Sequence, residues 1–315
     1  MEACDGARIM NLDFWIQVML LALFLDLLFG EPPAFMHPVV WMGNLINFFV
    51  NRAPKRHRKP YGLFMAAFCA GTALLAGMAI ASLGNGLPGL IIAAFFLKST
   101  FSIRMLIVSA LGIRKDLEGG NIEKVRSDLK TFVGRDTSKL NASQSASAVI
   151  ESLAESFVDG ILAPLFYFLL FGLPGALVCR MINTLDSMVA YKNEPFKELG
   201  YASARLDDIA NWVPARLSLL FIFMASIFFG KPLGAVRTCI RDNGKTASPN
   251  SGWSMSAVSG ALGVRLEKVG YHVLGAQYDE TQPVHICKAV GIVGLSSLLV
   301  VAGIFLIGKV AIIGY

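Results

Sequence analysis

Long apolar segments are the feature that most limits what this chain can fold into. A helix that crosses a membrane needs about 20 mostly apolar residues, and five or six segments approach that length. They lie at about 14–29, 62–83, 87–111, 161–182, 213–229 and 289–313. We therefore expect an all-α, polytopic helical membrane protein with five to six spans and with further helices on its cytoplasmic side.

The charge content supports a membrane protein and argues against a nucleic-acid partner. Only 16% of the 315 residues are charged and the mean hydropathy is +0.58, whereas a soluble domain carries about 25% charged residues. The net charge of +6 owes much to one basic run, RAPKRHRK at 52–59. Such a run between apolar segments is a cytoplasmic orientation signal. We expect a multi-pass protein of the cytoplasmic (inner) membrane, in contact with membrane lipid.

Two polar stretches, 112–160 and 231–288, separate the apolar segments. We expect a single integral membrane domain over 1–315 with both stretches packed on it. In the first stretch, Asn121 can cap one helix, and a second helix should run from about Asn141 to Asp159.

The fourth apolar segment is interrupted by GLPG at 172–175. It is either one span or a re-entrant hairpin of two half-helices, and the side of the membrane on which 183–212 lies depends on which is true.

The strongest polar motif is ESLAESFVDG at 151–160. Glu151, Glu155 and Asp159 are spaced i, i+4 and i+8, which places all three carboxylates on one face of a helix. Ile150, Leu153, Ala154, Phe157 and Val158 fall on the other side and should be buried. The row either holds Mg²⁺, directly or through a bound phosphate, or is a solvated face beside basic partners.

Two further polar clusters adjoin apolar segments. The first, NTLDSMVAYK at 183–192, contains Asn183, Asp186 and Lys192. The second, ARLDDIANWVPAR at 204–216, contains Arg205, Asp207, Asp208, Asn211 and Arg216. Acidic residues at a helix start and an arginine at a membrane interface have ordinary structural explanations. Two such clusters in one small protein favour a functional site.

Charge also lies inside the third apolar segment, where LKSTFSIR carries Lys98 and Arg104. Charge at membrane depth is costly and marks a functional site or a buried partner. Both side chains either face an anionic substrate or pair with Glu151 or Asp159.

A last motif lies in the second polar stretch. SPNSGW at 248–253 predicts a tight turn, and the small residues after it predict a closely packed helix. The sequence contains no Walker A loop, GxGxxG, CxxC or HExxH motif.

Taken together and in order, these motifs resemble the adenosylcobinamide-phosphate synthase family of cobalamin biosynthesis (CbiB/CobD type). The resemblance covers about 26–275. The matching stretches are DLLFGEPP with HPVVWMG, LKSTFSIR, VGRDTSKL, ESLAESFVDGILAPLFY, INTLDSMVAYK, ARLDDIANWVPARL, and SPNSGW with GALGVRL. Three positions depart from the family pattern: Ser156 replaces a frequent Asn, Ser254 replaces a usual Pro, and NGKT at 243–246 replaces a basic stretch.

The resemblance implies a membrane enzyme that joins an aminopropanol, either as its O-phosphate or in the free form, to the free carboxyl group of adenosylcobyric acid. The product would be the amide adenosylcobinamide phosphate or adenosylcobinamide, made by a ligase that uses ATP and Mg²⁺. Such activation of a carboxylate requires Mg²⁺ and cations to neutralise phosphate charge. The resemblance also implies a corrinoid partner, an amino-alcohol phosphate, and association with other late enzymes of the cobalamin pathway.

The polar residues divide into three groups under this interpretation. In the acidic group, Glu151, Glu155 and Asp159 would be catalytic metal ligands, Asp207 and Asp208 would also be catalytic, and Asp186 would bind substrate beside the metal. The cations that would bind phosphate are Lys98, Arg104, Lys192 and Arg205. The amides that would orient substrate are Asn183, Asn211 and Asn250.

Three other functions fit parts of the pattern. A CDP-alcohol or diphosphate transferase also places acidic residues on helices beside the membrane, but Pro164 stands where that pattern needs Arg, and the later Asp spacing fails. A non-catalytic membrane regulator would be expected to lack the carboxylate row. A transporter usually has repeated halves, which this sequence does not show.

Overall fold

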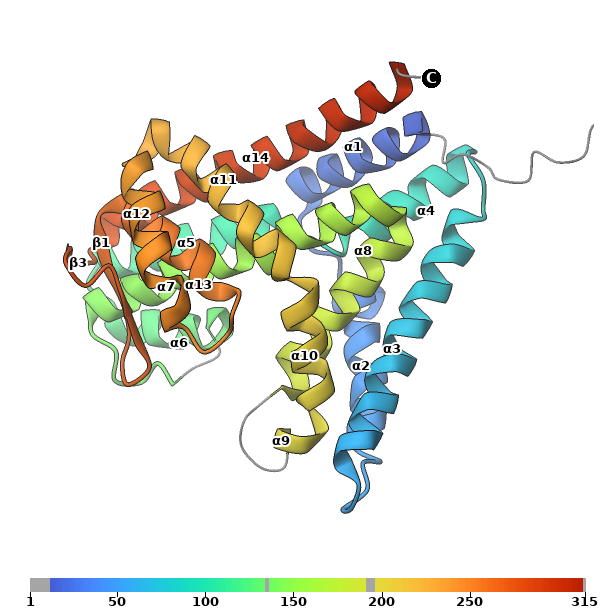
Figure 1. Ribbon diagram of the computed structural model, residues 1–315, viewed down its shortest axis with the longest axis horizontal. Helices are drawn as coiled ribbons and strands as arrows, with labels where there is room; N and C mark the ends of the chain where they lie inside the picture. The colour runs from blue at the N-terminus through green and yellow to red at the C-terminus, as the bar shows by residue number, and fades with distance from the viewer. Residues whose placement is uncertain (1–11, 134–135, 191–195, 314–315) are drawn as a thin grey trace, which may run out of the picture.

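The computed structural model describes residues 12–133, 136–190 and 196–313, and these fold mainly into helices (Figure 1). In chain order the first helices are α1 (Leu12–Phe29), α2 (Pro38–Val50), α3 (Arg58–Ala81), α4 (Leu87–Lys98), α5 (Ile103–Glu118), α6 (Ile122–Phe132) and α7 (Ala142–Phe157). A π-helical turn (Val158–Leu162) joins α7 to α8 (Ala163–Val189). The later elements are α9 (Phe196–Leu199), α10 (Tyr201–Ala210), α11 (Trp212–Phe229), α12 (Pro232–Asp242), α13 (Ser251–Leu262), β1 (Val264–Lys268), β2 (His272–Leu274), β3 (Asp279–Glu280) and α14 (Pro283–Ile313).

Five of the described helical stretches are long and apolar enough to cross a membrane. They are Arg58–Ala81, Leu87–Glu118, Ala142–Val189, Trp212–Phe229 and Pro283–Ile307. Several large apolar side chains on these stretches are exposed, among them Leu75, Phe228 and Leu298. Such faces suit lipid, so the expectation of an all-α polytopic membrane protein is confirmed.

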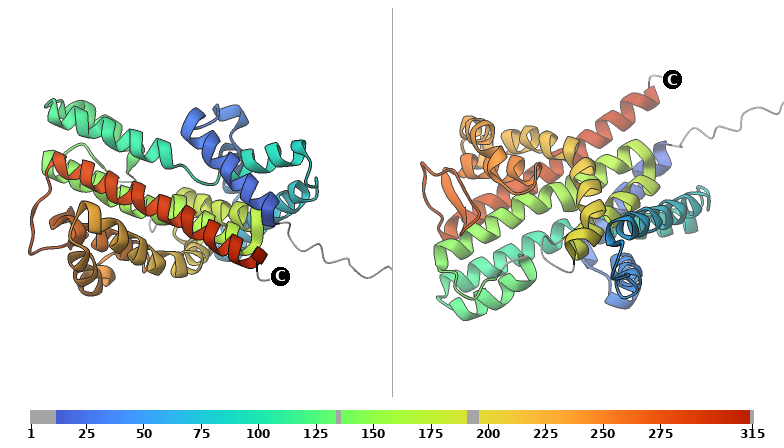
Figure 2. Two further views of the ribbon diagram at one scale, coloured as in Figure 1. Left: turned by 90° about the horizontal axis from the view of Figure 1, so that it is seen from above. Right: turned by 60° about the horizontal axis from the view of Figure 1, so that its bottom comes forward.

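The helices fall into two groups that cross at a steep angle. Figure 1 shows α11 and α14 running along the long axis, while α2, α3 and α10 run across it. Seen from above in Figure 2, α7 lies between α5 and α6 on one side and α12 and α13 on the other. The first polar stretch therefore supplies a central helix of the protein.

The helix expected from Asn141 begins there but does not end at Asp159. Asn141 accepts a hydrogen bond from the Gln144 backbone N–H, and the Gln144 side chain accepts from the Asn141 N–H, which completes a capping box. The helix then continues through the π-helical turn into α8. Pro164 lacks an N–H and would crowd the carbonyl four residues earlier, which accounts for the widened turn just before it.

The fourth apolar segment is two helices rather than one straight span. Gly172 has φ 63° and ψ −156°, a conformation that other residues avoid, and Pro174 follows it. A Cβ on Gly175 would lie 2.5 Å from the Tyr167 carbonyl oxygen, so the chain turns back onto the preceding turn. The hairpin alternative, with its turn at the Gly-Pro sequence, therefore describes this segment.

The second polar stretch forms a compact unit of two helices and a small sheet. The close packing expected after SPNSGW is confirmed, because a Cβ on Gly260 would collide with the Gly234 carbonyl oxygen of α12. In the sheet, whose strand order is β2-β1-β3, β1 is antiparallel to β2 and parallel to β3. This sheet was not predicted from the sequence, because strands of five, three and two residues carry too little alternation to be recognised.

Candidate active site

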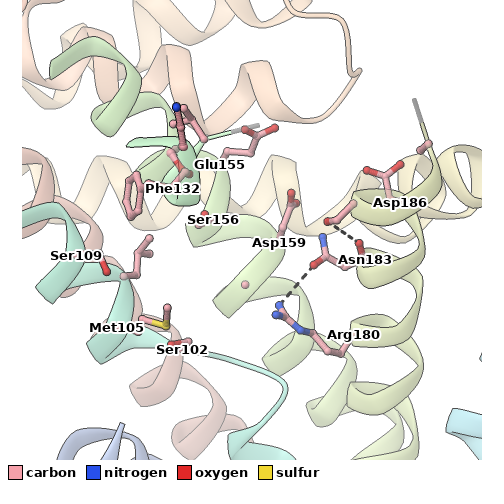
Figure 3. A pocket seen from close by; sticks show the side chains of 17 residues that line it. Ser102, Met105, Ser109, Phe132, Glu155, Ser156, Asp159, Arg180, Asn183 and Asp186 are labelled. Carbon is pink, nitrogen blue, oxygen red and sulfur yellow. Dashed lines mark hydrogen bonds between the residues drawn. The ribbon is translucent and has the colours of Figure 1, made fainter. Parts of the chain in front are cut away.

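The row of carboxylates lies along one face of the central helix, as the spacing predicts. Ile150, Leu153 and Phe157, on the opposite face, are fully buried. Glu155 and Asp159 point into a cavity of about 740 Å³ (Figure 3), which we call the main cavity. Asp159 lies in the π-helical turn, and such turns are frequent at functional sites.

The main cavity is lined by α5, α6, α7, the π-helical turn and the second half of α8. Figure 3 shows Asn183 and Asp186 facing Glu155 and Asp159 from a separate helix. Ser102 and Ser109 line the α5 side of the same space. The structure thus brings together the 151–160 and 183–192 motifs.

The turn at Gly172 creates this arrangement. Asp159 and Arg180 are 21 residues apart, a separation of about 30 Å in a straight helix. Because the second half of α8 folds back, both side chains line the main cavity. The site is therefore formed between the two arms of the hairpin.

Arg180 is a residue of this cavity that the sequence motifs did not single out. Its Nη1 donates to the Asn183 Oδ1 at 3.5 Å, and its Nε is buried without a hydrogen-bond partner. Among the residues that the structure describes, no carboxylate oxygen lies within 4 Å of its guanidinium. The signal was present, because an arginine inside the apolar run GALVCRMI should be regarded as a functional candidate.

A second space, which we call the side cavity, opens from the main one. Its volume is about 260 Å³, and it shares Phe132, Val133, Ser152 and Glu155 with the main cavity. Its other lining residues are Ala148, Glu151, Ala247, Ser248, Ser251, Met255 and Lys268. Glu151 is only 5% exposed, and its Oε1 lies 3.4 Å from the His272 Nε2. The carboxylate row therefore runs through two connected cavities.

Asp207, on α10, is not among the residues that line the main cavity. Burial raises the pKa of Asp207 to about 7, and the negative charge of Asp186 adds to the increase, while a hydrogen bond with Asn211 opposes it. Because each charge acts on the other, Asp207 can influence the acids that line the cavity.

Asp208 and Asn250 belong to a polar network that joins two motifs. The Asn250 side chain donates to the Asp208 carbonyl oxygen at 2.8 Å and accepts from the Arg216 Nη1 at 3.4 Å. Arg205 lies 3.3 Å from the Asp208 carboxylate. None of the described residues that line the two cavities comes from α10. The structure therefore gives Asp208, Arg205 and Asn250 partners outside the cavities.

Lys98 and Arg104 belong to a buried ion cluster around the end of α1. The Lys98 Nζ lies 2.8 Å from Glu31 and 3.6 Å from Asp26. The Asp26 carboxylate also accepts hydrogen bonds from the backbone N–H groups of Ile103 and Arg104. The Arg104 side chain donates a hydrogen bond to the Leu28 carbonyl oxygen. The suggested pairing of these two cations with Glu151 or Asp159 is wrong, because the acids at the end of α1 are nearer.

Glu31 and His37 complete this cluster, in which they lie 2.7 Å apart. Burial favours a raised pKa for Glu31, but hydrogen bonds from His37 and Lys98 outweigh it and lower the pKa to about 2. Glu31 is thus a carboxylate whose charge is matched by its neighbours. Lys192 lies outside the residues that the structure describes.

Comparisons with known proteins identify the family. The family model described as CobD/Cbib protein matches residues 19–293. The chain is 43% identical to the cobalamin biosynthesis protein CobD of Dehalococcoides mccartyi, over 84% of this chain and 87% of that protein. It is 40% identical to the probable cobalamin biosynthesis protein CobD of Methanothermobacter thermautotrophicus, over 93% and 98%.

The chain belongs to the CobD/CbiB family. No solved structure matches it. The match at 19–293 extends beyond the 26–275 expected from the motifs.

The three departures from the family pattern lie at or near the site. Ser156 lines the main cavity, and Ser254 is fully buried in α13. In the loop at 243–246, the Lys245 Nζ lies 2.7 Å from the Asp242 carboxylate. The lysine of this CobD/CbiB loop thus shares one protein carboxylate with Arg241, which lies 2.8 Å from it.

The acidic residues of this CobD/CbiB chain do not form a complete metal cage. Among the residues described by the structure, no three His, Cys, Asp or Glu side chains could hold a metal ion together. Neighbours in the row are about 6 Å apart along the helix and its ends about 12 Å apart. Mg²⁺ commonly binds one or two carboxylates together with substrate phosphates. The cavity fits a metal ion that arrives with a phosphate, and that form of the predicted magnesium site remains a prediction.

Proposed function

We propose that this protein is a membrane enzyme of cobalamin biosynthesis that makes adenosylcobinamide phosphate. It joins the amine of aminopropanol O-phosphate to the free carboxyl group of adenosylcobyric acid. The observation that carries the proposal is the cavity in the hairpin, where acids on one arm face Arg180 and Asn183 on the other. Membership of the CobD/CbiB family and the names of the relatives support it.

The reaction needs an activated carboxyl group. A carboxylate oxygen of adenosylcobyric acid attacks the terminal phosphorus of ATP, and ADP leaves. The amine nitrogen then attacks the carbonyl carbon of this acyl phosphate, the bond between carbon and the phosphate oxygen breaks, and inorganic phosphate leaves. Mg²⁺, when bound, neutralises the negative charge of the phosphates.

The residues of the main cavity suit both partners of this reaction. Arg180 offers a planar guanidinium to the corrinoid carboxylate, and Asn183 beside it can fix the orientation of that group. The amine arrives protonated and must lose a proton before it attacks. Asp159 and Asp186 line the space in which that ammonium would lie, and a carboxylate can accept its proton. Glu155, between the two cavities, is placed to share a metal ion with a phosphate.

The setting of the enzyme follows from its helices and its substrates. The five apolar stretches require a membrane, and the basic run at 52–59 favours the cytoplasmic (inner) membrane. Corrinoid and amino-alcohol phosphate would reach the site from the cytoplasm. The resemblance also supports an association with other late enzymes of the same pathway.

A direct assay tests the proposal. The full-length protein, purified in detergent, is mixed with adenosylcobyric acid, aminopropanol phosphate and Mg²⁺, with and without ATP, and corrinoid products are identified by mass. We expect an amide that forms only with ATP. Replacing the phosphate ester by free aminopropanol shows which amine is used. Folded protein that makes no amide under any of these conditions would overturn the proposal.

A further inference from the structure

The side cavity contains a cation that neither the motifs nor the proposed reaction uses. Lys268 is the last residue of β1. Alternate residues of a strand face the same side, and the two that share its side, Val264 and Leu266, are buried. Lys268 is therefore an inward-facing lysine at the end of a buried face, and its side chain lines the side cavity.

Lys268 has no close acidic partner. Among the described residues, no carboxylate oxygen lies within 4 Å of its Nζ, which stands 5.2 Å from the centre of the Tyr271 ring. Its charge nevertheless acts on Glu155. Lys98, Arg205 and Lys245 differ from Lys268, because each lies within 4 Å of a carboxylate.

Hydrogen-bond donors line the side cavity together with Lys268. Ser248 and Ser251 both line it. The Ser248 hydroxyl oxygen accepts the Asn250 N–H at 3.2 Å, so its own proton can be donated to a ligand. Glu151 and Glu155 lie on the helix that forms the third side. One lysine, two hydroxyls and two carboxylates therefore surround a single small space.

We propose that the side cavity is the phosphoryl-binding subsite of this enzyme. A phosphate group accepts hydrogen bonds from an ammonium and from hydroxyls, and its metal ion takes one or two carboxylates. The inference rests on the proposed function, since it assigns one of that reaction's substrates to this space. The phosphoryl group comes either from ATP or from aminopropanol phosphate, which present the same chemistry to Lys268.

The volumes of the two cavities fit a phosphate group in the side cavity and a larger substrate group in the main cavity. The side cavity, at about 260 Å³, has room for a small phosphate group, while the main cavity, at about 740 Å³, is left for the larger partner. The two spaces share Glu155, so a phosphoryl group on Lys268 would lie on one side of this residue and the larger partner on the other. Bond formation would then take place beside Glu155.

The test measures binding of each substrate separately to the full-length protein in detergent. The variant is Lys268→Met, which keeps the apolar stem and removes the charge. Titrations use a non-hydrolysable Mg²⁺–ATP analogue, aminopropanol phosphate and adenosylcobyric acid. We expect the Kd of one of the two phosphate compounds to rise about tenfold or more, the loss expected for a charge-assisted hydrogen bond. The Kd of adenosylcobyric acid should stay within about twofold. Whichever phosphate compound is affected identifies the source.

Two further variants make this result specific. Arg265→Met is the matched control, because Arg265 is on the same strand, faces the other side and lies 2.7 Å from Glu267. It should change none of the three constants. Lys268→Arg, which keeps a positive charge at this position, should retain most of the phosphate binding. An unchanged Kd of adenosylcobyric acid shows that Lys268→Met is folded. Unchanged Kd values for both phosphate compounds in Lys268→Met, or a change for the corrinoid alone, would overturn the subsite.

The subsite and the proposed reaction can fail independently. If a phosphate compound binds through Lys268 but no amide ever forms, the subsite stands and the reaction is wrong. If the amide forms and Lys268→Met binds both phosphate compounds normally, the reaction stands and the subsite is wrong.

Discussion

Two clusters of charge lie inside this membrane protein, and they differ in how well their charges are matched. Around the end of α1, Lys98 lies between Asp26 and Glu31, and Glu31 also bonds His37. In the main cavity, Glu155, Asp159 and Asp186 share the space with Arg180, whose guanidinium has no carboxylate within 4 Å among the described residues.

The difference separates a structural role from a functional one. A buried charge whose partner is in the protein holds segments together. Removing one partner leaves the other charge buried without compensation, which lowers the stability of the fold. A charge that faces a cavity without such a partner is available to a ligand. By this criterion the α1 cluster joins α1 to the α4–α5 connection, and the main cavity awaits substrate charge.

The largest expected effect is the loss of turnover in Glu155→Gln. Glu155 stands where the two cavities meet, and losing one such electrostatic group typically lowers the rate about a hundredfold or more. Amide formation should fall by at least that factor, while membrane insertion and detergent stability stay normal. The control is Glu123→Gln, an acid that is 80% exposed on α6, and its rate should equal that of the wild type. Wild-type turnover by Glu155→Gln would refute the role of the carboxylate row.

Lys98→Met is the substitution that we expect to lower stability the most. Removing the ammonium leaves Asp26, 1% exposed, and Glu31 without their shared cation. Breaking a buried pair in this way costs about 3–5 kcal/mol. Denaturant unfolding in detergent measures the change. Lys124→Met is the matched control, since its pair with Asp116 is solvent-exposed and should cost less than about 1 kcal/mol. Equal losses in the two variants would show that the α1 cluster stabilises the protein no more than an exposed ion pair does.

Arg180→Gln should weaken substrate binding strongly and change stability little, which is the reverse of the effect expected for Lys98→Met. We expect the KM for adenosylcobyric acid to rise about tenfold or more, because one charge-assisted contact to the substrate is lost. The free energy of unfolding should change by less than about 1 kcal/mol, since no carboxylate loses its partner. Steady-state kinetics and denaturant unfolding of the same preparation measure both. A large loss of stability with an unchanged KM would place Arg180 among the structural charges.

The smallest expected effect is a pH dependence that comes from Asp207. Its folded-state pKa is raised to about 7 from the ordinary aspartate value of 3.8, so the folded protein binds more protons than the unfolded chain between these values. The contribution of Asp207 to the free energy of unfolding therefore falls as the pH rises from about 4 to about 7.

Asp207→Asn removes this titration. Unfolding measured at several pH values in that range should show a flatter dependence for the variant than for the wild type. Parallel curves for the two proteins would show that Asp207 titrates near its ordinary pKa.

Local sequence patterns predicted the parts of the site that lie on one helix. The spacing of Glu151, Glu155 and Asp159 depends only on helical periodicity, and the buried face opposite them follows from the same rule. The start of α7 at Asn141 was predicted for a similar reason, because a cap is a contact between residues three positions apart. The membrane class follows from the length of the apolar segments.

Contacts between distant residues were decided by the tertiary structure. Asp159 and Arg180 line the same cavity because Gly172 turns the chain back, and the GLPG sequence allowed both a hairpin and a single span. Lys98 is paired with Asp26 and Glu31 because α1 lies beside the α4–α5 connection, which no spacing in the sequence reveals. Lys268 faces the carboxylate row only through a short strand placed against α7. Periodicity orders residues along one element, whereas a turn conformation and the packing between elements determine which charges meet.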